Sequence, residues 1–282
     1  MLKLAMNQGV LFSASTAQFL ELSSTYGLKA VELRAPKLKE WLYEVSSRKA
    51  KRVLADCGIS VIAVNSLDDF SLVPDENLSL LEKETEWIGQ MCEMVSCPLV
   101  IAPVGRWFDV RIPPEKVRDM SARRLELLNR VLSRYGVSVG VEPISFPEFS
   151  IQSIKEADDL CASSGNPANG LIVDYYNLFQ GGMQPSDFSC LASPVHLVHI
   201  NDAEFLPKDK LDVVENRAFP GEGSLDALTW TIEALRSGYD GYFSLEIFSK
   251  ALWALEPADG MYTAMHKLNR FAEAVEREWN KE

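Results

Sequence analysis

Short apolar segments alternate with longer segments of helical spacing along the whole chain. The apolar segments are rich in Val, Ile and Leu and are bounded by turn residues, which is typical of buried parallel strands. They lie at residues 2–6, 30–33, 59–64, 99–104, 137–142, 170–174, 195–200 and 242–247. Eight such strands, each followed by helical or connecting chain, predict an α/β fold: one closed (β/α)₈ TIM barrel that spans residues 1–282 as a single domain.

The segments between the strands carry apolar stripes at helical spacing. In residues 79–95 the predicted stripe consists of Leu80, Trp87, Ile88, Met91 and Val95, and similar stripes run through residues 113–135 and 261–275. Several helical runs are followed by a glycine that is expected to end the helix, at Gly27, Gly58, Gly136 and Gly238. Residues 175–194 and 201–223 are less regular, and we predict loops there on the face that holds barrel active sites.

Composition narrows the classes of partner. The net charge is −12, which disfavours binding to phosphate backbones and anionic lipid, so neither nucleic acid nor a membrane is an expected partner. The five cysteines are scattered without a Cys-x-x-Cys pair, as in proteins of a reducing compartment. No signal peptide and no run of about 18 apolar residues is evident. The sequence therefore predicts a soluble, cytoplasmic enzyme.

Each of the last four predicted strands ends with a residue that can bind a metal. These residues are Glu142, Asp174, His199 and Glu246. Side chains alternate along a strand, and the opposite faces of these strands are consistently apolar, so the carboxylates are expected to point into the barrel. His196 has the opposite parity to His199 and is expected to point outward.

Carboxylates gathered at a barrel mouth repel one another, and a divalent cation removes that repulsion. Three carboxylates and one imidazole form an oxygen-rich site, for which Mn²⁺ is the expected metal and Mg²⁺, Co²⁺ or Zn²⁺ are alternatives. Glu142 and Glu246 would flank a bound substrate and serve as catalytic acid and base. This arrangement predicts isomerisation or epimerisation of a sugar or polyol ketone through a metal-bound enediolate.

The segments VGVEP, GLIVDYYN, VHLVHIND, RAFPGEG and YFSLEIF resemble the xylose isomerase-like TIM barrel superfamily of sugar isomerases and epimerases, which includes AP-endonuclease family 2. Within it they are similar to the inosose isomerase (2-keto-myo-inositol isomerase) branch, and the likeness extends to VELR and NSLDDF. The resemblance implies metal binding by the four residues named above, catalysis by both glutamates, and substrate contact by Arg217. Members often have histidine where this chain has Asn177, which can bind a substrate hydroxyl but cannot carry a proton.

Further residues are candidates for substrate binding. Asn7, Glu32 and Asn65 end predicted strands and could bind polyol hydroxyls or cap loops. Trp107 and Phe108 could form an apolar wall against a sugar ring, cover a loop, or contact another subunit of a homo-oligomer.

Three other functions stay open. A dehydratase on the same barrel, acting on inosose or a 3-dehydroshikimate-like keto acid, would begin with the same proton removal. A non-catalytic sugar-binding barrel would not require two metal-bound glutamates. A DNA-repair endonuclease would need more than the three histidines present and a less acidic surface. A phosphorylated substrate is disfavoured because no glycine-rich phosphate cradle follows the last two strands.

Overall fold

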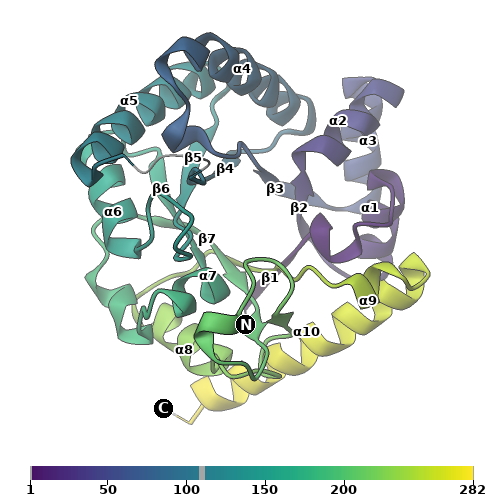
Figure 1. The fold of residues 1–282 in the computed structure, drawn as a ribbon. Helices are drawn as coiled ribbons and strands as arrows, with labels where there is room; N and C mark the ends of the chain where they lie inside the picture. The colour runs from purple at the N-terminus through teal and green to yellow at the C-terminus, as the bar shows by residue number, and fades with distance from the viewer. Residues whose placement is uncertain (1, 108–111, 282) are drawn as a thin grey trace.

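The computed structural model describes residues 2–107 and 112–281 and shows a closed barrel of parallel strands (Figure 1). The strands follow the order β1-β10-β7-β6-β5-β4-β3-β2 around the barrel. Their bounds are β1 Lys3–Asn7, β2 Ala30–Arg34, β3 Ser60–Asn65, β4 Leu99–Pro103, β5 Ser138–Glu142, β6 Asn169–Asp174, β7 Val195–Ile200 and β10 Tyr242–Leu245. Each lies within two residues of its predicted segment at either end, and the predicted TIM barrel is confirmed.

Helices surround the barrel (Figure 1). They are α1 Thr16–Thr25, α2 Ala35–Glu44, α3 Ser47–Cys57, α4 Leu78–Val95, α5 Pro114–Leu132, α6 Ile154–Ser163, α7 Tyr175–Gln180, α8 Ala227–Arg236, α9 Lys250–Trp253 and α10 Pro257–Trp279. In the described part of the chain, none of them is long and apolar enough to cross a membrane.

The helices bury most of the stripes that the sequence predicts; Trp87 on α4 is half-buried, and one predicted residue is exposed. On α10 the buried residues include Met261, Leu268 and Phe271, as expected. On α4, Leu80 is 59% exposed and Leu81 is buried in its place. Leu81 is the next residue along the helix and lies on the same face as Ile88, seven residues later. The prediction for Leu80 was therefore wrong.

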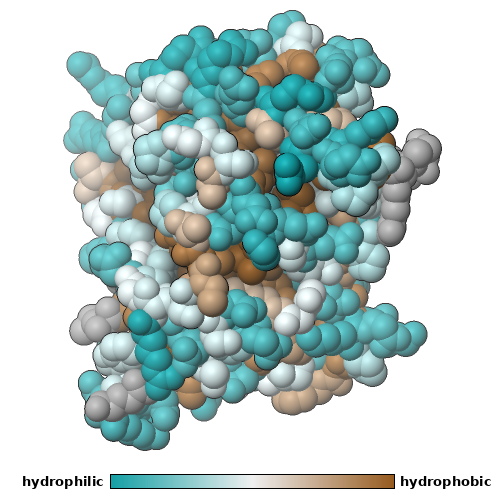
Figure 2. Space-filling view, turned by 90° about the vertical axis from the view of Figure 1, so that its left-hand side faces the viewer, coloured by the Kyte–Doolittle hydropathy of each residue, from teal (hydrophilic) through white to brown (hydrophobic). Residues whose placement is uncertain are grey.

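The core has two parts. The larger part lies between the strands and the outer helices, and apolar atoms show in recesses of the otherwise largely hydrophilic side that carries α5 and α6 (Figure 2). The smaller part fills the interior of the barrel and consists of Ala63, Leu99, Ile101, Ile172 and Leu197, which we call the interior plug. Because the plug fills the barrel, polar side chains above it are confined to the end where the strands finish.

A register shift changes the position of His196. Leu171 pairs with Val195 and Ile172 with Leu197, so β7 contains one extra residue at His196. His196 lines a small cavity with Leu99 and Tyr242, which begin their strands, and its Nε2 lies 3.1 Å from the carbonyl oxygen of Ala168. The predicted outward orientation was wrong because strict alternation fails at a bulge.

The segment after β7 contains a small hairpin that the sequence did not predict. Strands β8 Asp202–Ala203 and β9 Arg217–Ala218 pair antiparallel and bring Arg217 to the carboxyl end of the barrel. The segment after β6 begins with the short helix α7 and continues into a 3₁₀ helix at Pro185–Cys190.

Candidate metal centre

Four side chains converge at the carboxyl ends of β5, β6, β7 and β10. They are Glu142, Asp174, His199 and Glu246, all buried, and one potential ligand atom of each lies within 4.8 Å of those of the others. Glu142 and Asp174 are the last residues of their strands, and Glu246 follows the last residue of β10. The alternation in these strands thus brings together the four residues that the sequence predicted as a cluster.

His199 points one ring nitrogen at the three carboxylates. Its Nδ1 lies 3.2 Å from Glu246 Oε2, 3.6 Å from Asp174 Oδ2 and 3.7 Å from Glu142 Oε1. Nδ1 is buried and makes no hydrogen bond in the structure. A buried polar atom without a partner is uncommon in proteins and calls for a ligand.

Glu32 fixes the orientation of His199 from behind. Its Oε2 accepts a hydrogen bond from His199 Nε2 at 3.1 Å, and its Oε1 accepts one from the hydroxyl of Ser244. The hydrogen on Nε2 leaves Nδ1 as the nitrogen available to a metal, an arrangement common around metal-bound histidines. Glu32 is fully buried and does not line the cavity, so the structure places it behind the ligand and not against a substrate.

The carboxylates of the cluster are held by amide side chains. Asn7 and Asn65 donate to Glu246 Oε1 at 2.8 and 3.1 Å, and Asn177 donates to Glu142 Oε1 at 3.1 Å. Asn201 donates to Asp174 Oδ2 at 2.9 Å. Each carboxylate is thereby held in one orientation before any ligand arrives.

Arg217 is the one cation that contacts the carboxylates directly in the described part of the chain, apart from His199. Its Nη1 donates to Asp174 Oδ2 at 2.6 Å and to Glu246 Oε2 at 3.2 Å, and its Nη2 donates to Asn177 Oδ1 at 3.3 Å. One guanidinium therefore spans two carboxylates and the amide that holds the third.

The loop that presents Arg217 is organised by Asp202. The carboxylate of Asp202 accepts hydrogen bonds from the backbone N–H groups of Ala203, Gly221 and Leu225 at 2.8–3.0 Å. A Cβ on Gly223 would lie 2.1 Å from the carbonyl oxygen of Ala203, so that position requires glycine. The segments VHLVHIND and RAFPGEG are thus joined by hydrogen bonds. Asn201 holds the carboxylate of Asp174, and Asp202 holds the loop that follows Arg217.

The charges shift the proton affinities of the cluster in opposite directions. Burial raises the pKa of Glu142 to about 7, with a contribution from the charges of Glu246 and Asp174. Burial alone would raise the pKa of Asp174, but the charges of Arg217 and His199 hold it well below its usual range. Burial would lower the pKa of His199, but the charges of Glu246 and Glu32 raise it well above its usual value.

These residues fit a divalent cation. Three carboxylates face one imidazole nitrogen that has no hydrogen bond, and Arg217 alone does not balance their charge. Oxygen atoms and one nitrogen are the donors that Mn²⁺, Mg²⁺, Co²⁺ and Zn²⁺ accept. The cluster can therefore hold one divalent metal ion.

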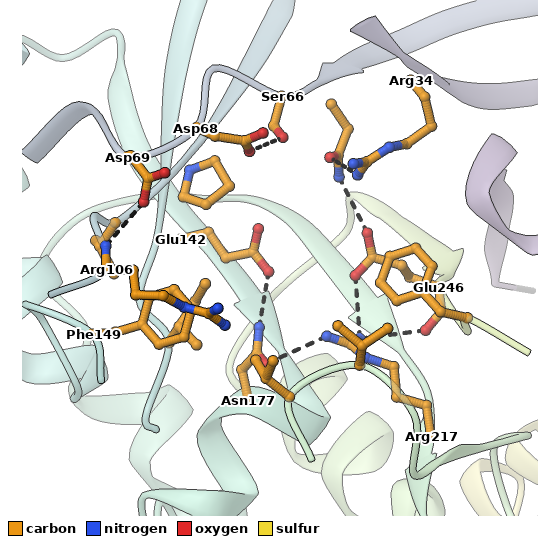
Figure 3. A pocket seen from close by; sticks show the side chains of 17 residues that line it. Arg34, Ser66, Asp68, Asp69, Arg106, Glu142, Phe149, Asn177, Arg217 and Glu246 are labelled. Carbon is orange, nitrogen blue, oxygen red and sulfur yellow. Dashed lines mark hydrogen bonds and ion pairs between the residues drawn. The ribbon is translucent and has the colours of Figure 1, made fainter. Parts of the chain in front are cut away.

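A cavity of about 420 Å³ opens above the cluster. Glu142, Asn177, Arg217 and Glu246 extend to one side of it, and Arg34, Asp68 and Arg106 lie around the rest (Figure 3). Its other lining residues are Asn65, Ser66, Asp69, Pro103, Val104, Ile144, Phe149, Val213, Val214 and Phe248. The volume and the polar lining suit a small polar molecule.

The predicted substrate-binding residues divide into two groups. Asn65, Asn177 and Arg217 line the cavity, whereas Asn7, Glu32 and Trp107 do not. Asn7 lies below Glu246, and Trp107 donates from Nε1 to the carbonyl oxygen of Phe149 at 3.0 Å, so it braces a loop. Phe108 lies outside the described residues.

Sequence reasoning missed several residues of the site. Arg34, Phe248 and Asp68 line the cavity, and Asn201 and Asp202 lie directly beneath it. All five lie at or just after the end of a strand, within the segments VELR, NSLDDF, VHLVHIND and YFSLEIF. Their position at strand ends was a signal that could have identified them.

Replacing Glu32 by glutamine should weaken metal binding about 10- to 100-fold, because outer partners of metal-bound histidines have effects of that size. Glutamine keeps the shape of the side chain but removes the charge that faces His199 Nε2. Calorimetric titration with Mn²⁺ would measure the change, and Glu21→Gln on the exposed face of α1 is the matched control. An affinity within twofold of the wild type would contradict the role assigned to Glu32.

Metal affinity should rise with pH. Below pH 7 a proton on Glu142, whose pKa is raised to about 7, competes with the cation. The raised pKa of His199 extends the competition above pH 7. Because both groups bind a proton there, we expect the Mn²⁺ affinity to fall by up to about a hundredfold per pH unit below pH 7. Titrations with Mn²⁺ at pH 6, 7 and 8 would measure this dependence. In Glu142→Gln the affinity should depend less steeply on pH. Equal wild-type affinities at the three pH values would refute the competition.

Comparison with known proteins places these features in context. The model of the xylose isomerase-like TIM barrel family matches residues 20–271. The inosose isomerase of Bacillus velezensis is 25% identical over 93% of this chain and 94% of its own length. The 3-dehydroshikimate dehydratase of Pseudomonas aeruginosa is 24% identical over 95% of this chain but only 42% of its own length.

A solved structure confirms the likeness in fold. The crystal structure of the IolI protein with a bound zinc atom superposes with a TM-score of 0.89 and covers 97% of this chain and 99% of that chain at 21% identity. At that identity the likeness establishes the fold.

Proposed function

Because the chain belongs to the xylose isomerase-like TIM barrel family, we propose that it is a divalent-metal-dependent isomerase or epimerase of a polyol ketone such as an inosose. The observation that carries the proposal is the convergence of Glu142, Asp174, Glu246 and the unpartnered Nδ1 of His199 beneath a polar cavity. We infer that Mn²⁺ is the metal, because three of the four ligands are carboxylates.

A bound divalent cation would polarise a substrate carbonyl and the hydroxyl on the adjacent carbon. This acidifies the proton on the carbon that carries the hydroxyl. The chain itself supplies the groups that move this proton. Glu142 and Glu246 come from strands on either side of β6 and β7 and both extend to the same cavity (Figure 3). One glutamate removes the proton and the other returns one to the opposite face or to the adjacent carbon.

Two features prepare Glu142 for this work. Burial raises the pKa of Glu142 in the metal-free protein to about 7, and the same burial favours proton uptake by this carboxylate. Asn177 holds Oε1, so the carboxylate stays in one orientation. Because the amide of Asn177 carries no titratable proton, the proton transfers rest on the two glutamates.

Comparison with the inosose isomerase supports this substrate class, because the match covers nearly the full length of both chains. The cavity offers amide and guanidinium groups for ring hydroxyls, from Asn65, Asn177 and Arg217. A neutral polyol ketone would satisfy these groups without bringing a further negative charge to a site that already holds three carboxylates.

Solvent deuterium exchange tests the proposal. A panel of inososes and ketoses is incubated in D₂O with the enzyme and Mn²⁺, and again after chelation. We expect label at a carbon next to the carbonyl only in the presence of metal. Absence of label in every substrate from enzyme that binds Mn²⁺ would refute the proposal.

A second candidate function, dehydration of a cyclic keto acid, is favoured by Arg34. In the described part of the chain, the guanidinium of Arg34 has Asn65 Oδ1 as its sole hydrogen-bond acceptor, lies 5.9 Å from the ring centre of Phe248 and forms no ion pair, so it can bind a substrate carboxylate. Removal of the same proton would then expel a β-hydroxyl as water. A new conjugated absorbance would identify this reaction, whereas isomerisation produces none.

A further inference from the structure

Arg124 is a buried cation outside the metal centre. It lies on α5 and its side chain is completely buried. Its Nε and Nη2 both donate to the carbonyl oxygen of Val73, at 3.0 and 2.7 Å, and Nη2 also contacts Asp75, whose side chain is 74% exposed. Burying a charge is costly. Here the guanidinium binds a neutral carbonyl through two nitrogens and a solvent-exposed carboxylate through one, and both acceptors lie in the chain after β3, so the arginine serves the loop that carries Val73.

That loop follows β3 and is joined to two neighbouring loops. The hydroxyl of Ser71 accepts from the backbone N–H of Gly105 at 2.7 Å and contacts the hydroxyl of Ser150 at 2.9 Å. The carboxylate of Asp69 accepts from the backbone N–H of Arg106 at 2.9 Å. The loops after β3, β4 and β5 are therefore connected through side chains of the first.

The second and third loops are also joined through their backbones. Ser150 N–H donates to the carbonyl oxygen of Gly105 at 2.9 Å, and Trp107 N–H donates to that of Glu148 at 2.7 Å. We call residues 66–73, 103–107 and 144–152 together the three-loop wall. A Cβ on Gly105 would lie 2.9 Å from Leu72, so the first two loops also pack without space between them.

The three-loop wall forms one side of the cavity. Asp68, Asp69, Arg106 and Phe149 belong to it and line the cavity opposite Arg217 (Figure 3). These loops follow β3, β4 and β5. Of the four metal-binding candidates, Glu142 alone comes from one of these strands, and it lies at the edge of the wall. Three of the four metal-binding candidates therefore stand on strands outside the wall, so loosening its loops is expected to affect substrate contacts more than the cluster.

We infer that Arg124 is a positioning residue for substrate binding. Through its two hydrogen bonds to the Val73 carbonyl, it fixes the three-loop wall to α5. The kinetic part of this inference rests on the proposed function. The structural part can be tested separately, because among the described residues Arg124 makes no hydrogen bond to the second or third loop and is linked to both through Ser71.

The test compares Arg124→Gln and Arg124→Lys with the wild type. In Arg124→Gln we expect amide hydrogen exchange at Gly105 and Ser150 to accelerate at least about tenfold, since their hydrogen bonds depend on the anchored loop. KM should rise about tenfold or more while kcat changes by less than about threefold, and Mn²⁺ affinity should stay within about twofold. Arg124→Lys keeps the charge but not the two-pronged contact, and should recover only part of the loss.

Two further variants make the test decisive. Arg123→Gln alters the exposed neighbour on the same helix and should behave as the wild type. Ser71→Ala breaks the link inside the wall with α5 intact, should give the same change in KM, and carries the test if Arg124→Gln does not fold. The effects of Arg124→Gln and Ser71→Ala should combine less than additively.

Unchanged exchange at Gly105 and Ser150 in folded Arg124→Gln would overturn the inference, and so would a loss of Mn²⁺ affinity as large as the change in KM. The exchange and metal titrations need no turnover. An enzyme inactive on every polyol ketone would therefore refute the proposed function. The hydrogen-exchange and metal-binding measurements would still test the anchoring by Arg124.

Discussion

Replacing both Glu142 and Glu246 by glutamine should abolish metal-dependent entry of solvent deuterium into substrate. General acid and base groups contribute about 10²- to 10⁴-fold each, so we expect the exchange rate to fall by at least about 10³-fold. The single variants should separate the roles. The glutamate that removes the proton is needed for exchange itself, whereas loss of the other should permit exchange and block formation of product. Mass spectrometry of the substrate and product pools would distinguish them.

Because both glutamates are also candidate metal ligands, the measurement requires Mn²⁺ at a concentration shown by titration to saturate each variant. Glu126→Gln, an exposed carboxylate on α5, is the matched control and should leave the rate unchanged. Abundant label from the saturated double variant would remove these residues from the mechanism.

The second large effect concerns stability. Arg217→Met should lower the free energy of unfolding of the metal-free protein by about 3–5 kcal/mol, because it removes one of the two cationic groups, Arg217 and His199, that contact the buried Asp174 and Glu246 among the described residues. Saturating Mn²⁺ should narrow this deficit, since the cation compensates the same carboxylates and binds the folded state. Denaturant unfolding with and without Mn²⁺ would measure both values.

Arg270→Met on the exposed face of α10 controls for the loss of an arginine and should change stability by less than about 0.5 kcal/mol. Equal deficits for Arg217→Met in the two conditions would show that Arg217 does not balance the charge of the cluster.

The barrel could be predicted from sequence because its strands repeat one simple signal. Buried parallel strands appear as short apolar runs, and the glycines that end helices mark their limits. The cluster could be predicted for a related reason: Glu142, Asp174 and Glu246 break the apolar pattern at equivalent positions of their strands.

Depth within the barrel could not be predicted. Alternation says that Glu32 and Asn7 point inward, but inward-facing side chains occupy successive layers. Glu32 pairs with Ala63, a residue of the interior plug, and therefore lies beneath the cavity and not beside it. Alternation along a strand shows whether a side chain points into or out of the barrel. It does not show in which layer along the barrel axis the side chain lies.

The cavity wall is the least predictable part, because it consists of loops. Arg106 and Phe149 reach the site from connections without periodic pattern, and Arg124 forms hydrogen bonds to a neighbouring connection from a helix. The hairpin that presents Arg217 consists of two-residue strands, which are too short to leave a recognisable pattern of alternation.

The interior plug determines the order in which ligands arrive. Since Ala63, Ile101 and Leu197 fill the barrel beneath the cluster, a cation must come down the same passage as the organic molecule and come to rest deeper in it. On the proposed function, a metal ion would have to bind before the substrate, and a bound substrate would block its way back through this passage. Chelators should then strip resting enzyme quickly and working enzyme slowly, so that turnover protects the enzyme from losing its metal.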